Sequence, residues 1–117
     1  MKKILCVIES SPYGNEKAFQ QLRLALQLVE DSTPTQPIEL NVFFISDGVY
    51  CALPKQTSED KNIEQLLDIL IMQGVTMEAC KTCLQERGLS KVRLIDDIHI
   101  GTLHQLAQWT LHADIKI

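Results

Sequence analysis

The sequence predicts a single α/β domain with a mostly parallel sheet and flanking helices, and two observations lead to this class. Residues 4–8 and 40–45 form short, continuous apolar runs, which are typical of strands covered on both faces of a parallel sheet. Between these runs, apolar side chains recur at helical spacing. Strands that alternate with helices through short connections imply a parallel sheet with right-handed crossovers.

The first predicted strand leads into a loop at residues 10–14 and then into a helix. Asn15 is a suitable N-cap for this helix, which we expect to continue to about Glu30. Pro34 closes the helix off before the second strand, which ends in a turn at residues 46–48. The apolar side chains of the helix form one stripe, made of Phe19, Leu22, Leu26 and Val29.

The middle of the chain predicts an exposed loop and an unusually apolar helix. Residues 54–61 are polar and charged, so we expect this loop to be mobile until a partner or substrate arrives. Asn62 and Gln65 resemble a capping box for a helix over Ile63–Met72. Its apolar residues cover more than one face, so something besides the sheet must cover it. Because exposed apolar patches usually mark interfaces, we expect an oligomer.

The last third of the chain supplies the remaining predicted elements. Residues 75–79 read as a third strand, which places Cys80 at its carboxyl end. Thr102 and Gln105 form a capping box for a last helix, and residues 115–117 suit a final strand. Ligands of parallel sheets bind beyond the carboxyl ends of the strands. The side of the last helix that we expect to be apolar carries Leu103, Leu106, Ala107 and Leu111.

Composition limits the function classes. The chain has 117 residues, of which 45% are hydrophobic and 22% charged, as expected of one globular domain over residues 1–117. Its formal net charge of −4 argues against nucleic acid as a partner. The first apolar run ends at Glu9, too short for a signal-peptide core, and no run approaches membrane-spanning length. We therefore expect a cytoplasmic protein with no membrane partner.

In a reducing compartment, the C-x-x-C pair Cys80 and Cys83 favours metal binding or redox chemistry over a structural disulfide. A structural zinc site needs four ligands, and one C-x-x-C supplies only two. A thioredoxin-type site would lie after an early strand at the start of a long helix, whereas this pair lies late in the chain. Buried free cysteines also serve as small apolar fillers. Spacing alone leaves these alternatives open, and we expect no metal and no cofactor.

Several segments narrow the choice because they occur in register from the first strand to the last helix. They resemble the DsrE/DsrF-like family, and most closely its YchN branch. The resemblance implies a flavodoxin-like α/β fold, a homo-oligomer that is a hexamer in the YchN branch, and a part in intracellular sulfur transfer. The segments are Ser11-Pro12-Tyr13-Gly14, Leu22-Arg23-Leu24-Ala25, Ser46-Asp47, Cys80-Lys81-Thr82-Cys83, Arg87-Gly88, Ile100-Gly101-Thr102-Leu103 and Leu106-Ala107-Gln108-Trp109-Thr110-Leu111.

The same resemblance assigns roles to the cysteines. Cys80 matches the cysteine that carries sulfur as a persulfide in the relay members of the family, and Cys83 matches a second cysteine found in the YchN branch. We therefore expect a sulfur-carrier or sulfurtransferase-like protein that exchanges sulfur with donor and acceptor proteins. The alternative is a non-catalytic, oligomeric binding module for a small ligand or a protein partner. Backbone amides after Cys80, in a short helix expected to run to Glu86, are expected to favour its thiolate.

Other residues are weaker candidates. We expect Lys81 or Arg87 to favour the thiolate if either turns inward. Asp47 fits ligand orientation and ordinary turn chemistry equally well, and Tyr13, next to Gly14, suits loop packing as well as pocket lining. Of the remaining cysteines, Cys6 is expected in the core and Cys51 is less certain. Surface positions are expected for His99, His104 and His112, and packing for Trp109.

Overall fold

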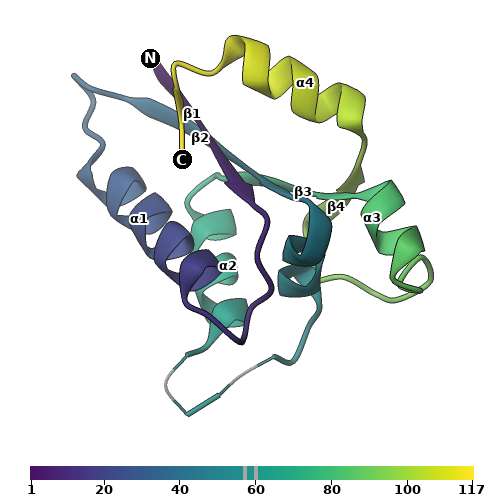
Figure 1. Ribbon diagram of the computed structural model, residues 1–117. Coiled ribbons are helices and arrows are strands. Elements are labelled where there is room, and N and C mark those ends of the chain that lie inside the picture. Colours follow the sequence, from purple (N-terminus) through teal and green to yellow (C-terminus); the bar gives the residue numbers. More distant parts are fainter. Residues whose placement is uncertain (57, 60) are drawn as a thin grey trace.

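Five parallel strands form one sheet in the computed structural model, which describes every residue except 57 and 60. The strand order is β4-β3-β2-β1-β5 (Figure 1), so the predicted α/β class is confirmed. The elements in chain order are β1 (Lys2–Ile8), α1 (Lys17–Asp31), β2 (Ile38–Phe44), the 3-10 helix η1 (Ser46–Ala52), α2 (Ile63–Met72), β3 (Thr76–Cys80), α3 (Lys81–Glu86), β4 (Ile98–Gly101), α4 (Leu103–His112) and β5 (Ile115–Lys116).

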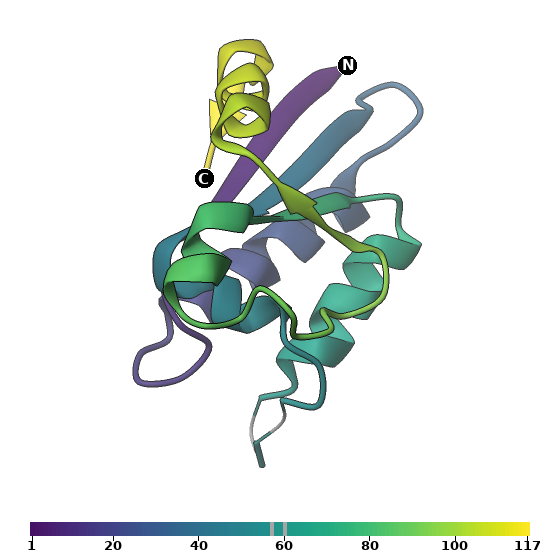
Figure 2. The same cartoon turned by 90° about the vertical axis from the view of Figure 1, so that its right-hand side faces the viewer.

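Helices cover both faces of the sheet. Figures 1 and 2 show α1 and α2 on one face and α4 on the other, with α3 beyond the carboxyl end of β3. From β1 to β4 the chain adds strands in one direction, and α4 then returns it across the sheet to β5, on the other side of β1. The molecule thus has the parallel strands and the two covered faces of a flavodoxin-like fold. Its strand order differs from that of flavodoxin itself, which is 2-1-3-4-5.

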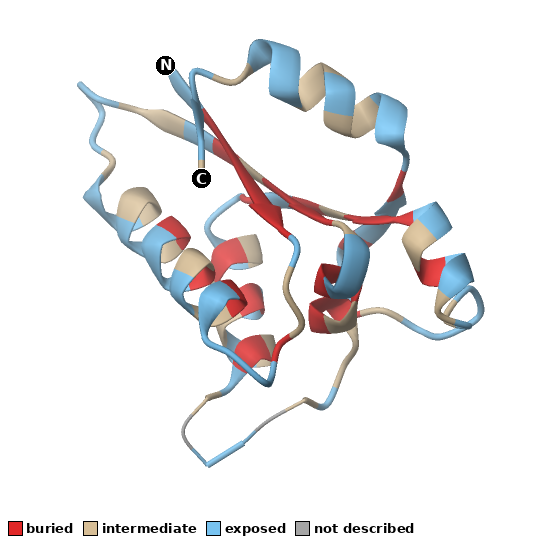
Figure 3. Ribbon diagram, viewed as in Figure 1, coloured by how far each residue is buried: buried red, intermediate tan, exposed pale blue. Residues whose placement is uncertain are grey.

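The main core lies between the sheet and the layer of α1, α2 and η1. Alternate residues of each strand point to opposite faces, and those facing α1 and α2 are apolar and buried. In Figure 3 the buried residues follow the strands and the inward sides of these helices, whereas α4 has none. The buried strand residues on this face are Ile4, Cys6, Ile8, Leu40, Val42, Phe44, Met77, Ala79 and Ile98.

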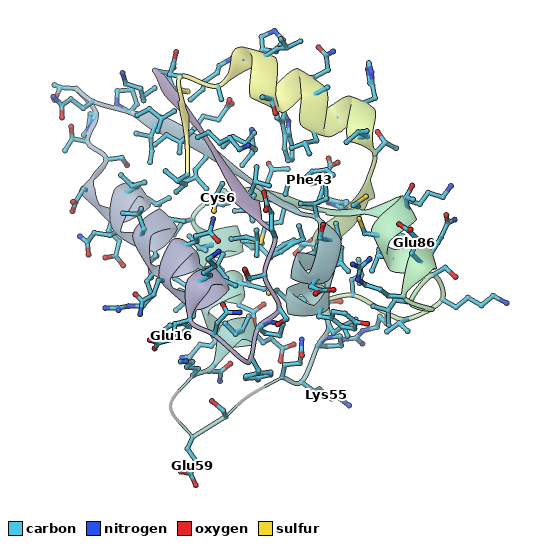
Figure 4. All side chains as sticks on the ribbon, viewed as in Figure 1. Cys6, Glu16, Phe43, Lys55, Glu59 and Glu86 are labelled. Atoms are coloured by element: carbon cyan, nitrogen blue, oxygen red, sulfur yellow. The ribbon has the colours of Figure 1, made fainter. Side chains whose placement is uncertain are left out.

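The face beneath α4 is more polar. A groove of about 500 Å³ separates part of α4 from the sheet. Phe43 faces α4 (Figure 4), and its ring meets that of Trp109 edge-on, with centroids 6.2 Å apart. Packing is thus the role of Trp109, as expected. The polar side chains lining the groove include Lys3, Glu39, Asn41, Gln105, Gln108 and His112.

The predicted caps of α2 and α4 are confirmed, whereas the N-cap residue of α1 is Glu16 and not the predicted Asn15. Asn62 Oδ1 accepts a hydrogen bond of 2.9 Å from the Gln65 amide, and Thr102 Oγ1 accepts one of 3.3 Å from the Gln105 amide. Asn15 Oδ1 accepts from the Lys17 amide at 2.9 Å, at the point where α1 begins. The strand β4 was not predicted, because its short sequence Ile-His-Ile-Gly contains too few residues to show a period.

Two expectations about exposed apolar surface change. The residues that cover α2 come from the same chain, because α1 and η1 pack against it. Of the apolar residues of α2, only Met72 at its end is largely exposed. On α4, in contrast, the predicted inward stripe is wrong for Ala107, which is exposed, and for Leu103 and Leu111, which are 67% and 77% exposed. Leu106 and Trp109 are the α4 residues that pack on the core. Between these two helices, α4 therefore has more exposed apolar residues than α2.

Thr57 and Asp60 of the loop expected to be mobile lie outside the described residues, so its mobility stays a prediction. At the end of this loop, Lys61 Nζ lies 3.4 Å from Glu16 Oε1 and 5.6 Å from the centre of the Phe19 ring. Within the described part of the chain, no helix has the length and apolar character needed to cross a membrane.

Candidate active site

The two cysteines of the C-x-x-C pair lie at the junction of β3 and α3. Cys80 is the last residue of β3 and the N-cap residue of α3, and its side chain is almost buried, with 5% of the residue exposed. Cys83 lies one helical turn further on and is half-buried. Because residues three apart on a helix are neighbours on its surface, the junction brings the two thiols together.

A backbone amide that follows the neighbouring strand β2 points at Cys83. The Ser46 N–H donates a hydrogen bond to Cys83 Sγ over 3.2 Å. Ser46 follows β2 and has φ of 54°, in the left-handed region that residues other than glycine rarely adopt. Strained residues of this kind are common at functional sites. The conformation directs the chain from β2 into η1, with the Ser46 amide toward α3.

Gly48 holds this turn close to β1. A Cβ atom at Gly48 would lie 1.9 Å from the carbonyl oxygen of Ile8, which also accepts a hydrogen bond from the Ile45 amide. Only glycine fits at this distance. The end of β1 therefore sets the position of the turn that faces Cys83.

A charged pair ties α3 to the same turn. Arg87 Nε donates to Asp47 Oδ1 over 3.1 Å, and Arg87 Nη1 donates to the carbonyl oxygen of Cys83, also over 3.1 Å. The hydrogen bond that Arg87 donates to Asp47 is the main influence that raises the pKa of Arg87. Arg87 is therefore a fixed cation on the side of α3 that carries Cys83.

Four influences act on the Cys83 thiol. Burial is the largest and raises its pKa, the Ser46 hydrogen bond acts in the opposite direction, the neighbouring Cys80 side chain raises it, and the charge of Arg87 lowers it. The pKa of Cys83 remains above its ordinary value, so the resting site holds a protonated thiol. The hydrogen bond from the Ser46 amide and the positive charge of the guanidinium nevertheless stabilise a Cys83 thiolate when it forms.

The remaining cysteines belong to the core. Cys6 lies on β1 (Figure 4), and burial raises its pKa to about 12. Burial likewise raises the pKa of Cys51 to about 12, and its thiol donates to the Ser10 carbonyl oxygen at 3.6 Å. Neither is a nucleophile near neutral pH.

Four of the predicted site residues come together: Cys80, Cys83, Asp47 and Arg87. The expectation that amides of α3 stabilise a Cys80 thiolate is wrong, because the Cys80 side chain accepts no capping hydrogen bond. The amide and the cation act on Cys83 instead. The sequence does not single out Ser46 as a site residue, because a pattern of side chains does not show which backbone amides point at a site.

The other predicted residues lie apart from this cluster. Lys81 is exposed on the first turn of α3. Tyr13 and Gly14 lie in the loop after β1, where Ser11 Oγ donates to the Tyr13 carbonyl oxygen over 2.7 Å. The hydrogen bonds of the described residues do not connect this loop to Cys80 or Cys83.

The residues that the structure describes contain no group of three or more His, Cys, Asp or Glu side chains arranged to hold a metal ion. The three histidines are exposed, as expected. Thiols, an amide and a guanidinium thus make up the site, and these groups suit the chemistry of sulfur nucleophiles.

The family is decided by comparison with known proteins. A sequence model of the DsrE/DsrF-like family matches residues 2–117. The chain belongs to the DsrE/DsrF-like family. Protein YchN of Escherichia coli K12 is 46% identical over 97% of this chain and 96% of its own length. The uncharacterized protein MK0008 of Methanopyrus kandleri is 34% identical over 95% of this chain and 88% of its own length.

Solved structures agree with this DsrE/DsrF-like assignment. The crystal structure of the ychN protein from E. coli superposes with a TM-score of 0.92 at 45% identity, covering 100% of this chain and 98% of the other. The protein of unknown function MTH1491 from Methanobacterium thermoautotrophicum shares the fold, with a TM-score of 0.77 at 16% identity and full coverage of both chains. The resemblance to the YchN branch is confirmed.

Proposed function

We propose that this protein is a sulfur carrier that accepts sulfane sulfur as a persulfide on Cys80. Membership of the DsrE/DsrF-like family links the chain to sulfur relay. The observation that carries the proposal is the junction of β3 and α3, where two neighbouring thiols meet the Ser46 amide and the Arg87 cation. The other two cysteines are core residues with high pKa values.

Loading is a single sulfur transfer. The Cys80 thiolate attacks the outer sulfur of a donor persulfide, R–S–SH, and a bond forms between that sulfur and Cys80 Sγ. The bond between the two donor sulfurs breaks, and the donor leaves as the thiolate R–S⁻. Cys80 then carries –S–SH, and no net oxidation occurs. This sulfurtransferase-like step needs no metal or cofactor.

The surroundings of the carrier follow from the same chemistry. We place it in a reducing compartment, the cytoplasm, because its four cysteines are free thiols. A protein donor and acceptor are the expected partners. We also propose a homo-oligomer, a hexamer as in the YchN branch, and the exposed apolar residues of α4 favour α4 as a contact surface.

A second function is favoured by one observation, the 5% exposure of Cys80. A carrier thiol must be reached by its donor, so such burial suits a non-catalytic oligomeric module that binds a small ligand or a protein. In that case the pair would be a packing element of the β3–α3 junction. Sulfur loading separates the two functions.

The test is sulfur loading measured by mass spectrometry. The reduced protein is incubated with a low-molecular-weight persulfide such as glutathione persulfide, alkylated and digested. We expect one added sulfur on Cys80 and none on Cys6 or Cys51. Cys80→Ser should abolish loading, whereas Gln85→Ala, an exposed change on the same helix, should not alter it. Full loading of Cys80→Ser would reject Cys80 as the sulfur acceptor, and no loading of the unmodified protein would favour the binding module.

A further inference from the structure

We propose that Cys83 resolves the persulfide on Cys80, so that the protein releases its sulfur as hydrosulfide and is left with a Cys80–Cys83 disulfide. This inference rests on the proposed loading of Cys80 and assigns the next step of the same site. It names the product, HS⁻, and the class of co-reactant that each cycle then requires, a dithiol reductant.

The first argument is the distribution of groups that stabilise a thiolate. The Ser46 amide donates to Cys83 Sγ, and the Arg87 guanidinium is held beside Cys83 by its bond to the Cys83 carbonyl oxygen. Both groups favour negative charge on sulfur. Cys80, in contrast, receives no capping hydrogen bond from α3. The better attacking thiolate is therefore Cys83, although the sulfur is loaded on Cys80.

The second argument is geometric. Cys80 is the N-cap residue of α3, and Cys83 lies three residues later in the first turn of the helix. Their side chains are close enough for Cys80 to raise the pKa of Cys83. A disulfide needs Cα atoms roughly 4.4–6.8 Å apart, which neighbours on one helical turn can reach.

The third argument is access. Cys80 is 5% exposed, and the turn at residues 46–48 and α3 stand around it. An acceptor protein would have to bring its own thiolate to this atom. Cys83 is already there, and hydrosulfide is small enough to leave without opening the site. An internal thiol therefore reaches Cys80 without the approach that an outside thiol would need.

The step balances as follows. Cys83 loses its proton to solvent, and its thiolate attacks Cys80 Sγ. The bond between Cys80 Sγ and the outer sulfur breaks, and that sulfur leaves with its proton and the electron pair as HS⁻. The outer sulfur is thereby reduced to sulfide while the two cysteines are oxidised to the disulfide. A dithiol then returns both cysteines to thiols by thiol–disulfide exchange and becomes a disulfide itself.

The experiment follows one turnover without reductant. The reduced protein is mixed with one equivalent of glutathione persulfide, released hydrosulfide is trapped with monobromobimane, and peptides are mapped under non-reducing conditions. We expect hydrosulfide and the Cys80–Cys83 disulfide to appear together, in equal amounts and at the same rate. With Cys83→Ser, persulfide should accumulate on Cys80 and hydrosulfide release should fall at least tenfold. Gln85→Ala should behave as the unmodified protein does.

The pH profile of release tests the role of Arg87. Because its charge lowers the pKa of Cys83, Arg87→Gln should move the midpoint of hydrosulfide release to higher pH, and Arg87→Lys should restore part of the shift. A structural role alone would lower the amplitude without moving the midpoint.

The two proposals fail differently. If Cys80 loads but the persulfide persists without a disulfide, or if Cys83→Ser releases hydrosulfide as fast as the unmodified protein, the resolving role of Cys83 is overturned and loading stands. If the sulfur is found on Cys83, the assignment of the two roles is wrong. If nothing loads, both proposals are rejected.

Discussion

At the scale of single residues, the four cysteines divide by their surroundings. Cys6 and Cys51 are fully buried, and burial alone takes the pKa of each to about 12. Cys83 is half-buried, and two groups act against the effect of burial on its pKa. The reactivity of each thiol thus depends on the groups around its sulfur, and the sequence alone does not show these groups.

This division predicts the order of alkylation. With iodoacetamide near neutral pH, we expect Cys83 to be labelled in the native protein while Cys6 and Cys51 stay unmodified, because a thiol with a pKa of about 12 is almost entirely protonated. Time-resolved peptide mass spectrometry measures the four rates. All four should be labelled in denaturant, which serves as the control. Labelling of Cys6 at the rate of Cys83 in the folded protein would contradict the assignment of Cys6 to the core.

Glu78 gives a second prediction at this scale. Burial raises its pKa above 4.5, and His99 opposes the rise. For a carboxyl with a raised folded-state pKa, the unfolded state releases its proton first, so stability falls as pH rises from about the ordinary value through the folded one. Glu78→Gln should therefore unfold at a higher temperature than the unmodified protein at pH 7.

The advantage of Glu78→Gln should disappear below the ordinary pKa of 4.5, where the carboxyl is protonated in both states. Thermal unfolding followed by circular dichroism between pH 3.5 and 8 covers this window, and Glu86→Gln, an exposed change on α3, is the matched control. An advantage that grew on acidification would show that Glu78 is stabilised as the anion.

At the scale of elements, the turn between β2 and η1 links β1 to α3. Gly48 approaches the carbonyl oxygen of Ile8, the Ser46 amide reaches Cys83, and Asp47 binds Arg87. Three consecutive residues thus contact two elements that lie far apart in the chain. The Ser-Asp-Gly sequence predicts a turn, but its partners depend on the sheet that brings these elements to one edge.

The turn predicts opposite effects for two neighbouring substitutions. Gly48→Ala should lower the free energy of unfolding by roughly 1–3 kcal/mol, since its Cβ would overlap the Ile8 carbonyl oxygen. Ser46→Gly should raise it by roughly 1 kcal/mol, because glycine adopts the left-handed conformation without strain and keeps the amide. Urea titrations of both variants provide the measurement. Equal stability of Gly48→Ala and the unmodified protein would mean that the turn moves freely away from β1.

At the scale of the whole molecule, the two covered faces are unequal. The α1 and α2 side contains the main core, whereas no residue of α4 is fully buried and Leu103 and Leu111 face outward. A helix with apolar residues on both its inner and outer sides is typical of a helix that has neighbours on both. If the chain self-associates as proposed, α4 is therefore a better candidate contact surface than α2.

This asymmetry predicts which surface substitution changes the assembly. Leu111→Lys should lower the mass in solution toward that of one chain, because it places a charge in an apolar contact, and should leave the fold intact. Met72→Lys is the matched control, since Met72 is 86% exposed but lies at the end of α2. Light scattering gives the mass and circular dichroism the fold. A drop in mass with Met72→Lys but not with Leu111→Lys would place the contact on α2.

Periodicity, caps and motifs by themselves determined the fold class, most elements and the family. The runs at residues 4–8 and 40–45 predicted β1 and β2, and Asn62 and Thr102 marked the starts of α2 and α4. These signals are local: each depends on residues within about one helical turn or one strand, which a sequence shows directly. The motifs likewise led to Cys80 and Cys83.

Only the tertiary structure decided how the site is arranged. The strand order puts β2 beside β3, and this places the Ser46 amide and Asp47 next to Cys83 and Arg87, about 40 residues away along the chain. The same packing covers α2 with α1 and leaves Leu111 exposed. Such contacts arise from which elements share the core, and the free energy of that packing is summed over the whole chain. No local sequence pattern reports this free energy. Only the folded structure therefore shows that the Ser46 amide and the Arg87 cation lie beside Cys83 and not, as expected, beside Cys80.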